Sequence, residues 1–342
     1  MPILHNKGSD TRRGLLFRKG LRILLTVLLI YSLSSMLLSA VMFRVLFRRT
    51  DGLSPIRYTY SEVDHEAYPR QSFSFPSGDH VLSACRYPAA NASGEIVVIN
   101  GISAGIDSHL AEIMYFIDHG WSVVTWDATG VGGSGGRGLI GLQQIRLDLI
   151  AYLDYRQAQG ETLPLVLYGH SAGAYAAATV LDGDGYPVCG SVCLCGFDSP
   201  LSVMLYHARQ RVGVLADAQY PFLLLENLFL FGKDADISAI ESINHSKAHV
   251  LLVESSSDDL VPHELGLLRN GSEFSNPNVS AVTVDSHWRN EHNTPWLSSA
   301  AAEYVGSIAP GETVDKQRSC ELDPAFMEQV LAFFTEAVSE AG

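Results

Sequence analysis

The chain is poor in cysteine, and its few cysteines are unevenly placed. Five among 342 residues are too few and too irregularly spaced for a framework of disulfides. Cys189, Cys193 and Cys195 share the apolar stretch VCGSVCLCG, which predicts buried thiols in a strand. Because no second pair of ligands accompanies this spacing, no metal site is predicted. The sequence leaves open whether Cys85 and Cys320 pair, which requires an oxidising compartment.

Acidic residues are scarce before residue 50, and basic residues are scarce after it. Residues 1–49 contain nine of the 23 Lys and Arg residues but a single acid, Asp10, for a net charge of +8. Residues 50–342 contain 14 basic residues against 36 acids, for a net charge of −22. A body this acidic repels phosphate backbones, so nucleic acid is not expected as a partner. An apolar fraction of 47% also excludes a chain that is disordered throughout.

Residues 23–43 contain no charge and form the one long hydrophobic run. A helix of these 21 residues is about 30 Å long, enough to cross the hydrocarbon core of a bilayer. The flanking basic residues are Lys7, Arg12, Arg13, Arg18, Lys19 and Arg22 before the run, and Arg44, Arg48 and Arg49 after it. This excess before the run favours a cytoplasmic N-terminus and an extracytoplasmic body. We therefore predict a basic cytoplasmic head at 1–22 and a single membrane anchor at 23–43.

Two other interpretations of the N-terminus remain. It could be a cleaved signal peptide, or a twin-arginine export signal carried by TRRGLL at residues 11–16. The run exceeds a typical signal core and arginines follow it closely, which favours the uncleaved anchor.

Beyond the anchor, a polar linker is predicted at 44–72 and a single body at 73–342. Strands are predicted at 80–86, 95–100, 121–126, 163–168, 188–195, 249–254 and 279–284. Helices are predicted near 108–119, 140–158, 172–181, 262–269, 298–307 and 323–338. Apolar strands that alternate with helices indicate an α/β fold, with a mostly parallel central sheet and helices on both faces.

One connection breaks this rhythm. Residues 197–248 separate two predicted strands, and their middle, YPFLLLENLFLF at 220–231, carries one charge. A long insertion of this kind is typical of a lid, so we predict a helical lid at 197–248.

The segment Gly169-His170-Ser171-Ala172-Gly173 follows the apolar strand LPLVLY and begins the alanine-rich helix AGAYAAATVL. The pattern G-x-S-x-G also occurs in ordinary turns. Between a strand and a helix, however, it predicts a tight elbow that exposes the Ser171 hydroxyl at the carboxyl edge of the sheet.

Three further segments strengthen this interpretation. They are IVVINGISAG at 96–105, WSVVTWDATGVGGSGG at 121–136 and HVLLVESSSDDLVP at 249–262. Together with GHSAG they resemble the α/β-hydrolase superfamily over residues 75–340, most of all its lipase-like and serine-aminopeptidase-like members. The chain departs from the usual motifs at Asn100, where a histidine is common, and at Ser255, where a glycine is common.

The resemblance implies a catalytic triad in the chain order Ser, Asp, His, with Ser171 as the nucleophile. It places the acid at Asp258, with Asp259 as the alternative. Two histidines follow the last predicted strand, and we favour His292 over His287 because it lies closer to the helix predicted from residue 298. The backbone N–H groups of Ile102 and Ala172 are the predicted oxyanion donors.

Two further patterns do not predict a cofactor or a metal site. Residues 130–135 match the dinucleotide pattern G-x-G-x-x-G, but no acid follows at the end of a next strand, so no nicotinamide cofactor is predicted. Glu291-His292 with His287 does not form a zinc-binding H-E-x-x-H motif.

The predicted function is that of a serine hydrolase without cofactor or metal, acting on a small-molecule acyl substrate. The apolar insertion and the membrane helix favour a hydrophobic carboxylic ester, as for an esterase or lipase-like enzyme. A peptidase or amidase of the same fold is the alternative. A non-catalytic binding module on a hydrolase scaffold is a further one.

Overall fold

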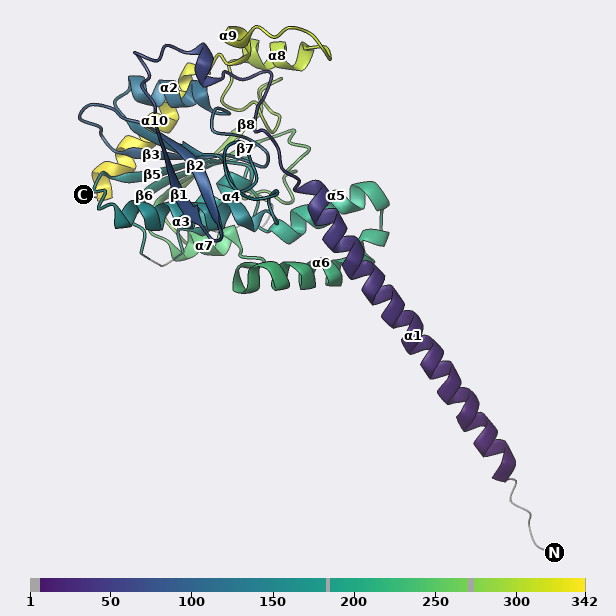
Figure 1. The fold of residues 1–342 in the computed structure, drawn as a ribbon. Helices are drawn as coiled ribbons and strands as arrows, with labels where there is room; N and C mark the ends of the chain where they lie inside the picture. Colours follow the sequence, from purple (N-terminus) through teal and green to yellow (C-terminus); the bar gives the residue numbers. More distant parts are fainter. Residues whose placement is uncertain (1–6, 183–184, 270–273, 342) are drawn as a thin grey trace, which may run out of the picture.

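The computed structural model describes residues 7–182, 185–269 and 274–341, and Figure 1 shows a sheet-centred body from which one long helix projects. The eight strands of the sheet are β1 (Gln71–Ser77), β2 (His80–Tyr87), β3 (Glu95–Ile99), β4 (Ser122–Trp126), β5 (Leu165–His170), β6 (Val188–Leu194), β7 (His249–Ser255) and β8 (Val279–Val284). Their order is β1-β2-β4-β3-β5-β6-β7-β8. The β1–β2 and β2–β4 pairs are antiparallel and the others parallel, which confirms the predicted mostly parallel sheet.

Helices cover both faces, because the side chains of each central strand alternate between two apolar cores. Val97 and Ile99 of β3 belong to the core that includes Leu149 of α3 (Gln143–Ala158) and residues of α4 (Ala172–Thr179). Ile96 and Val98 face the opposite core, formed with α2 (Leu110–Asp118) and α10 (Pro324–Ala341). All residues of β3 and β4 are buried, which explains their uninterrupted apolar sequences.

The N-terminal helix α1 (Lys7–Leu46) extends beyond the predicted span at both ends. Its section Leu15–Leu46 is long and apolar enough to cross a membrane, and 11% of its most apolar window is buried. A signal sequence would have the same character. The following segment is irregular except for the 3-10 helix η1 (Tyr60–Glu62), and it lies against the body. The bridges Arg48↔Gly138 and Thr50↔Val131 fix its beginning there.

The insertion contains α5 (Pro200–Val212), α6 (Leu215–Phe231), η2 (Gly232–Asp234) and α7 (Ala239–His245). The Ser199 hydroxyl accepts a hydrogen bond from the Ser202 N–H and caps α5, and Ser238 caps α7 in the same way. Gly213 and Gly232 end α5 and α6 with positive φ angles, so the chain turns sharply at both places.

The structure corrects two details of the predicted elements. No strand was predicted before residue 80, but residues 71–77 form β1, which pairs with β2 at the edge of the sheet. The helix predicted near 262–269 is wrong, because this segment forms turns and an isolated bridge, Phe197↔Gly266. The Glu254 carboxylate accepts a hydrogen bond from the Leu268 N–H and so holds the segment in its turned form. The remaining helices are α8 (Ser299–Ser307) and α9 (Lys316–Ser319).

Candidate active site

Ser171 lies between the last residue of β5 and the first residue of α4, as the sequence predicts. Its backbone has φ 57° and ψ −120°, a conformation that residues other than glycine rarely adopt. The elbow is tightly packed, because a Cβ atom at Gly173 would lie 2.1 Å from the Ile99 carbonyl oxygen. A Cβ atom at Gly169 would lie 2.4 Å from the Gly173 carbonyl oxygen. The two glycines thus permit the strained turn that presents the Ser171 side chain.

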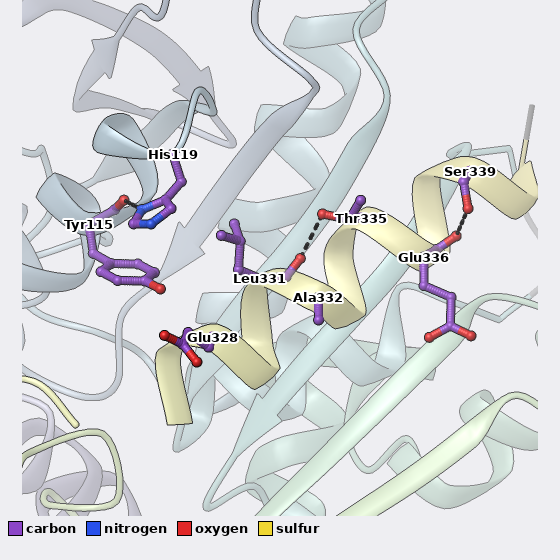
Figure 2. Close-up of a pocket in the computed structure, with 8 residues that line it drawn as sticks. All are labelled: Tyr115, His119, Glu328, Leu331, Ala332, Thr335, Glu336 and Ser339. Atoms are coloured by element: carbon purple, nitrogen blue, oxygen red, sulfur yellow. Dashed lines mark hydrogen bonds between the residues drawn. The ribbon is translucent and has the colours of Figure 1, made fainter. Parts of the chain in front are cut away.

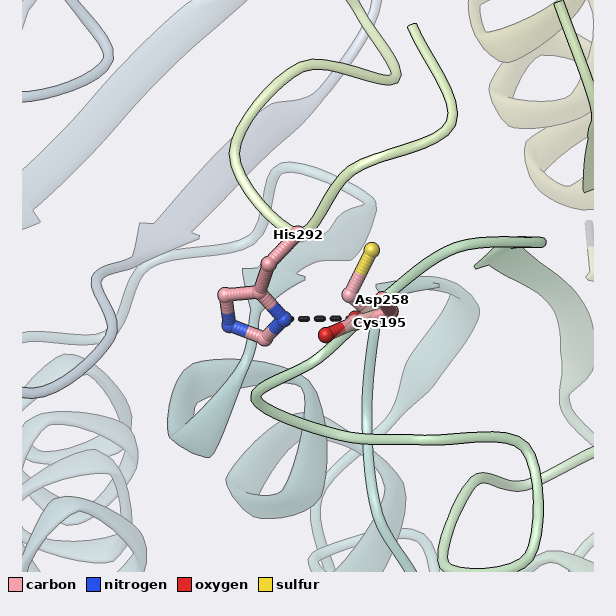
Figure 3. A group of neighbouring side chains, drawn as sticks. All are labelled: Cys195, Asp258 and His292. Carbon is pink, nitrogen blue, oxygen red and sulfur yellow. Dashed lines mark hydrogen bonds and ion pairs between the residues drawn. The ribbon is translucent and has the colours of Figure 1, made fainter.

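Asp258 and His292 are brought together from the loops that follow β7 and β8. The Asp258 Oδ2 atom lies 2.6 Å from His292 Nδ1, and both side chains are buried (Figure 3). The other carboxylate oxygen, Oδ1, accepts hydrogen bonds from the N–H groups of Leu260 at 2.9 Å and Val261 at 2.7 Å. The carboxylate is therefore fixed on both sides, and one of its oxygens is aimed at the imidazole.

The alternative acid and base lie outside this pair. Asp259 is exposed beside Asp258. His287 is also exposed and has its ring against Trp288, with the ring centres 4.7 Å apart. Of the predicted candidates, the structure thus brings together Asp258 and His292.

His170, the residue before Ser171, links the elbow to the His292 loop. Its Nε2 atom lies 3.0 Å from the His292 carbonyl oxygen, and since a carbonyl only accepts, this Nε2 carries the proton. The two imidazole ring centres are 4.9 Å apart. His170 thereby couples the position of the imidazole to the turn that carries Ser171.

A cluster of buried side chains supports His170. The Trp296 and His109 rings lie 4.9 and 5.5 Å from the His170 ring. His109 Nδ1 in turn lies 2.6 Å from Glu112 Oε1. Burial lowers the pKa of His170 well below its ordinary value, and the neighbouring His292 and His109 lower it further. The ring therefore stays neutral. Sequence reasoning missed this cluster, and the one available signal was the place of His170 inside GHSAG.

The predicted oxyanion donors flank the nucleophile. Ala172 is the first residue of α4, so its N–H has no partner within the helix. On the other side, a Cβ atom at Gly101 would lie 3.2 Å from Ser171 Cβ, which brings the backbone next to Ile102 close to the nucleophile. The Asn100 side chain points elsewhere, because its Nδ2 donates to Thr125 Oγ1 and the Trp126 carbonyl at 3.3 Å. A role for this segment must therefore come from its backbone.

Cys195, at the end of β6, also lies beside the Asp258–His292 pair (Figure 3). One ligand atom from each of the three residues lies within 4.8 Å of the others. Burial, and next the Asp258 charge, raise the pKa of the Cys195 thiol well above its ordinary value. Metal binding requires a thiolate, so the environment of Cys195 does not suit a metal ligand.

A surface hollow of about 540 Å³ lies elsewhere, between α2 and α10 (Figure 2). It is lined by Tyr115, His119, Glu328, Leu331, Ala332, Thr335, Glu336 and Ser339. The hydrogen bonds drawn in Figure 2 join residues of the same helix or its C-terminal cap. No residue of the candidate active site lines this hollow, so the structure does not connect it with Ser171.

Comparisons with known proteins agree with the fold and the elbow. Residues 90–215, which include GHSAG, match a family model described as serine aminopeptidase, S33, over rather more than a third of the chain. No curated protein sequence gives a significant match.

Solved structures share the architecture at low sequence identity. An esterase of Pyrococcus furiosus is 16% identical with a TM-score of 0.56, over 85% of this chain and 98% of that one. The esterase Est1E of Butyrivibrio proteoclasticus, solved with ferulic acid bound, is 13% identical with a TM-score of 0.52, over 78% and 99%. An acylaminoacyl peptidase of Pyrococcus horikoshii is 14% identical with a TM-score of 0.50, over 78% of this chain and 41% of that one. Sheet order, elbow and the solved structures together show the α/β-hydrolase fold, and residues 90–215 are similar to the serine aminopeptidase, S33, family.

Proposed function

We propose that the protein is a serine hydrolase that cleaves carboxylic acyl esters through an acyl-enzyme on Ser171. The buried contact of 2.6 Å between Asp258 and His292 carries this proposal. The loop that carries His292 is joined to the nucleophile elbow by the hydrogen bond from His170 to the His292 carbonyl.

In the proposed reaction, the Ser171 Oγ attacks the ester carbonyl while His292 Nε2 takes its proton. Asp258 holds Nδ1–H and stabilises the imidazolium. The N–H groups of Ile102 and Ala172 stabilise the oxyanion. When the tetrahedral intermediate collapses, the C–O bond breaks and His292 returns the proton to the leaving alcohol. Water then attacks the acyl-enzyme and loses a proton to His292. The bond between the acyl carbon and Ser171 Oγ breaks, the acid leaves, and His292 returns the proton to Oγ.

We further propose that α1 is an uncleaved single-pass anchor, with a cytoplasmic N-terminus and the hydrolase body on the other side of the membrane. The basic residues before the apolar section support this orientation. A hydrophobic acyl chain suits the rim of the site, where Ile102 and Leu260 are 40% and 44% exposed. The preferred substrate is therefore an ester with a long acyl chain, and the insertion at 197–248 acts as a lid.

A second candidate, peptide or amide cleavage, is favoured by the match to the serine aminopeptidase model. The leaving group distinguishes the two, since an amine must be protonated before it departs. A panel of acyl esters against aminoacyl amides, ranked by kcat/KM, decides between them.

A fluorophosphonate probe tests the proposed chemistry. We expect it to label the protein on Ser171, and Ser171→Ala to abolish both labelling and hydrolysis. His292→Ala should lower kcat about as much as Ser171→Ala, because triad members act as a unit. The control His287→Ala should leave kcat nearly unchanged. Labelling that persists in Ser171→Ala would refute the assignment, and an unlabelled wild-type protein would favour a non-catalytic binding module.

A further inference from the structure

One face of α1 is docked along the body instead of standing free. Ser35, Ser39 and Phe43 are buried at a spacing of four residues, so they share one face of the helix, and Phe47 directly after its end is buried as well. On the other faces of the same section the apolar side chains are exposed, for example Leu37 at 66%. The docked face is about 18 Å long, measured from Ser35 to Phe47. The partner of its first part is α6, which crosses α1 in Figure 1.

Polar contacts fix this crossing. Gln219 Nε2 donates to the Ser35 carbonyl at 2.6 Å and lies 2.9 Å from Ser39 Oγ. The Tyr31 hydroxyl donates to the Ala218 carbonyl at 3.0 Å, and its ring packs edge-on against Phe222. Small residues at the contact and hydrogen bonds between helices are typical of helix pairs within membranes, where lipid offers no partner to a polar group.

The crossing fixes the level of α6 relative to the proposed span. Ser35 and Ser39 precede Arg44 by nine and five residues, which corresponds to about 14 and 8 Å along the helix. The hydrocarbon core of a bilayer is about 30 Å thick. If α1 spans the membrane, the contact with Gln219 lies within the half of the core on the side of the body.

Much of the exposed surface of α6 is apolar, and the exposed charge of Asp217 in its first turn is paired with Arg209 at 2.6 Å. Val214 and Leu215 at its beginning are 82% and 72% exposed, and Leu225 and Phe229 further along are 51% and 86% exposed. Exposed apolar side chains of this size and number are unusual on a surface that faces water. They continue the exposed apolar surface of α1, to which α6 is joined at Gln219.

The end of α1 leads directly to the candidate active site. The Thr50 hydroxyl lies 3.5 Å from the Ser103 carbonyl, and the Gly105 N–H donates to the Gly52 carbonyl at 3.0 Å. Ser103 follows Ile102, whose N–H is the proposed oxyanion donor. At the insertion, His207 of α5 contacts the Leu260 carbonyl at 2.9 Å, two residues beyond Asp258. The segment that follows α1 and the helix α5 that precedes α6 therefore adjoin the edge of the sheet at which Ser171 lies.

From these contacts we propose that α6 is embedded in the phospholipid bilayer that α1 spans, in the leaflet on the side of the body. The hydrolase then works at the membrane surface, and its substrate is an amphiphilic ester taken from that leaflet. This inference rests on the proposed membrane span and on the proposed ester hydrolysis. It adds a second, lipid-facing element and a source for the substrate.

Depth-dependent quenching tests the position of α6 in the full-length protein. Single cysteines at Leu28→Cys, Phe229→Cys and Glu303→Cys carry a fluorophore in a Cys189→Ser background, since the other four native cysteines are buried. The protein is placed in phosphatidylcholine vesicles that contain nitroxide-labelled lipid. Glu303 is the control, because it is exposed on α8, on the side of the body away from the projecting end of α1 (Figure 1).

We expect the labels at 28 and 229 to lose fluorescence and the label at 303 to keep it. Quenching at 28 without quenching at 229 overturns the inference and leaves the span in place. This is the result if a second copy of the chain covers α6. No quenching at 28 refutes the span, and the inference with it.

A functional readout separates lipid contact from ester chemistry. Phe229→Asp should lower hydrolysis of a long-chain ester embedded in vesicles about ten-fold, because a large apolar side chain no longer enters the bilayer. Hydrolysis of a dissolved acetate ester should stay unchanged, and Glu303→Ala should affect neither substrate. Equal losses on both substrates would contradict a role in lipid contact. Absence of hydrolysis in the wild-type protein would refute the proposed function instead, while the quenching result would still stand.

Discussion

Replacing Asp258 by Asn tests the candidate triad most sharply, because the structure predicts how the site responds. The Oδ1 atom of Asp258 accepts two backbone hydrogen bonds, from Leu260 and Val261. An Asn side chain keeps these bonds only if its carbonyl oxygen occupies the same position. Its NH₂ group then faces His292 Nδ1, where the carboxylate oxygen lies at 2.6 Å in the native protein.

Two donors cannot share a hydrogen bond, so the His292 ring must move its proton from Nδ1 to Nε2. An imidazole protonated at Nε2 cannot accept the Ser171 proton. We therefore expect Asp258→Asn to lower kcat by about 10³ to 10⁴, or roughly 4 to 5.5 kcal/mol in activation free energy, while substrate binding changes little. The volume of the side chain is nearly unchanged, so the melting temperature should fall only slightly.

The neighbouring residue provides the matched control. Asp259 is exposed, and Asp259→Asn should leave kcat within about two-fold of the wild-type value. Steady-state hydrolysis of a nitrophenyl ester, measured beside a thermal unfolding curve for each variant, gives both quantities. If Asp258→Asn keeps more than a tenth of the activity, or if Asp259→Asn is the more damaging change, the proposed acid is wrong.

Two further predictions concern residues outside the triad. His170→Phe removes the donor to the His292 carbonyl and should lower kcat about ten-fold with little change in KM, whereas His170→Gln, which still donates, should recover part of that loss. A loss of melting temperature with no effect on kcat would instead mean a purely structural role. A hydrogen bond from Lys316, and to a smaller extent one from the backbone N–H of Thr59, lowers the pKa of Glu62 from 4.5 to about 2. The ionised carboxylate therefore stabilises the fold above pH 4.5, and this contribution disappears as the pH falls through 2. Because the pair is partly exposed, Glu62→Gln should cost no more than about 1 kcal/mol at pH 7, and the difference in unfolding free energy should vanish near pH 2; a constant difference at every pH would refute the ionic explanation.

The central sheet was predictable because its inner strands are buried on both faces. The sequences EIVVI and SVVTW of β3 and β4 consist mostly of apolar and β-branched residues. A short continuous run of such residues is typical of a strand that is buried on both faces of a parallel sheet. β1 escaped prediction because it is an edge strand. Its sequence QSFSFPS alternates polar and apolar residues and contains Pro76, and only Phe75 and Ser77 are buried. A half-exposed edge strand leaves a weaker pattern than a buried one.

The nucleophile elbow was predictable for a related reason. Its glycines, its serine and the flanking apolar strand are consecutive in the sequence, so one local pattern contains the whole feature. Asp258 and His292 are 34 positions apart and meet only through the tertiary fold. The resemblance to known hydrolases suggested both, but the residues themselves left Asp259 and His287 as alternatives. The contacts of His170 with His109 and Trp296 had no such guide, since two loops and a strand end that are distant in sequence contribute to them.

The two loops that carry Asp258 and His292 lack helix and strand, yet direct bonds hold them together. The Ser257 N–H donates to the Asn290 carbonyl at 2.8 Å, and the Asn290 amide donates to Ser257 Oγ at 2.9 Å. Arg289 joins the histidine loop to the scaffold, with one nitrogen 2.8 Å from Asp323 and another donating to the Pro295 carbonyl.

These bonds explain how irregular segments can hold a catalytic pair. Each loop leaves a parallel strand at the same edge of the sheet, and the two loops are fixed to each other. The histidine loop is also bonded to Asp323, the residue before α10. Periodicity encodes the strands, which decide where the loops begin. The separation of Asp258 from His292 depends instead on specific polar contacts whose partners are distant in sequence. A variant that removes one contact, such as Arg289→Met, should therefore disturb catalysis before it disturbs the sheet.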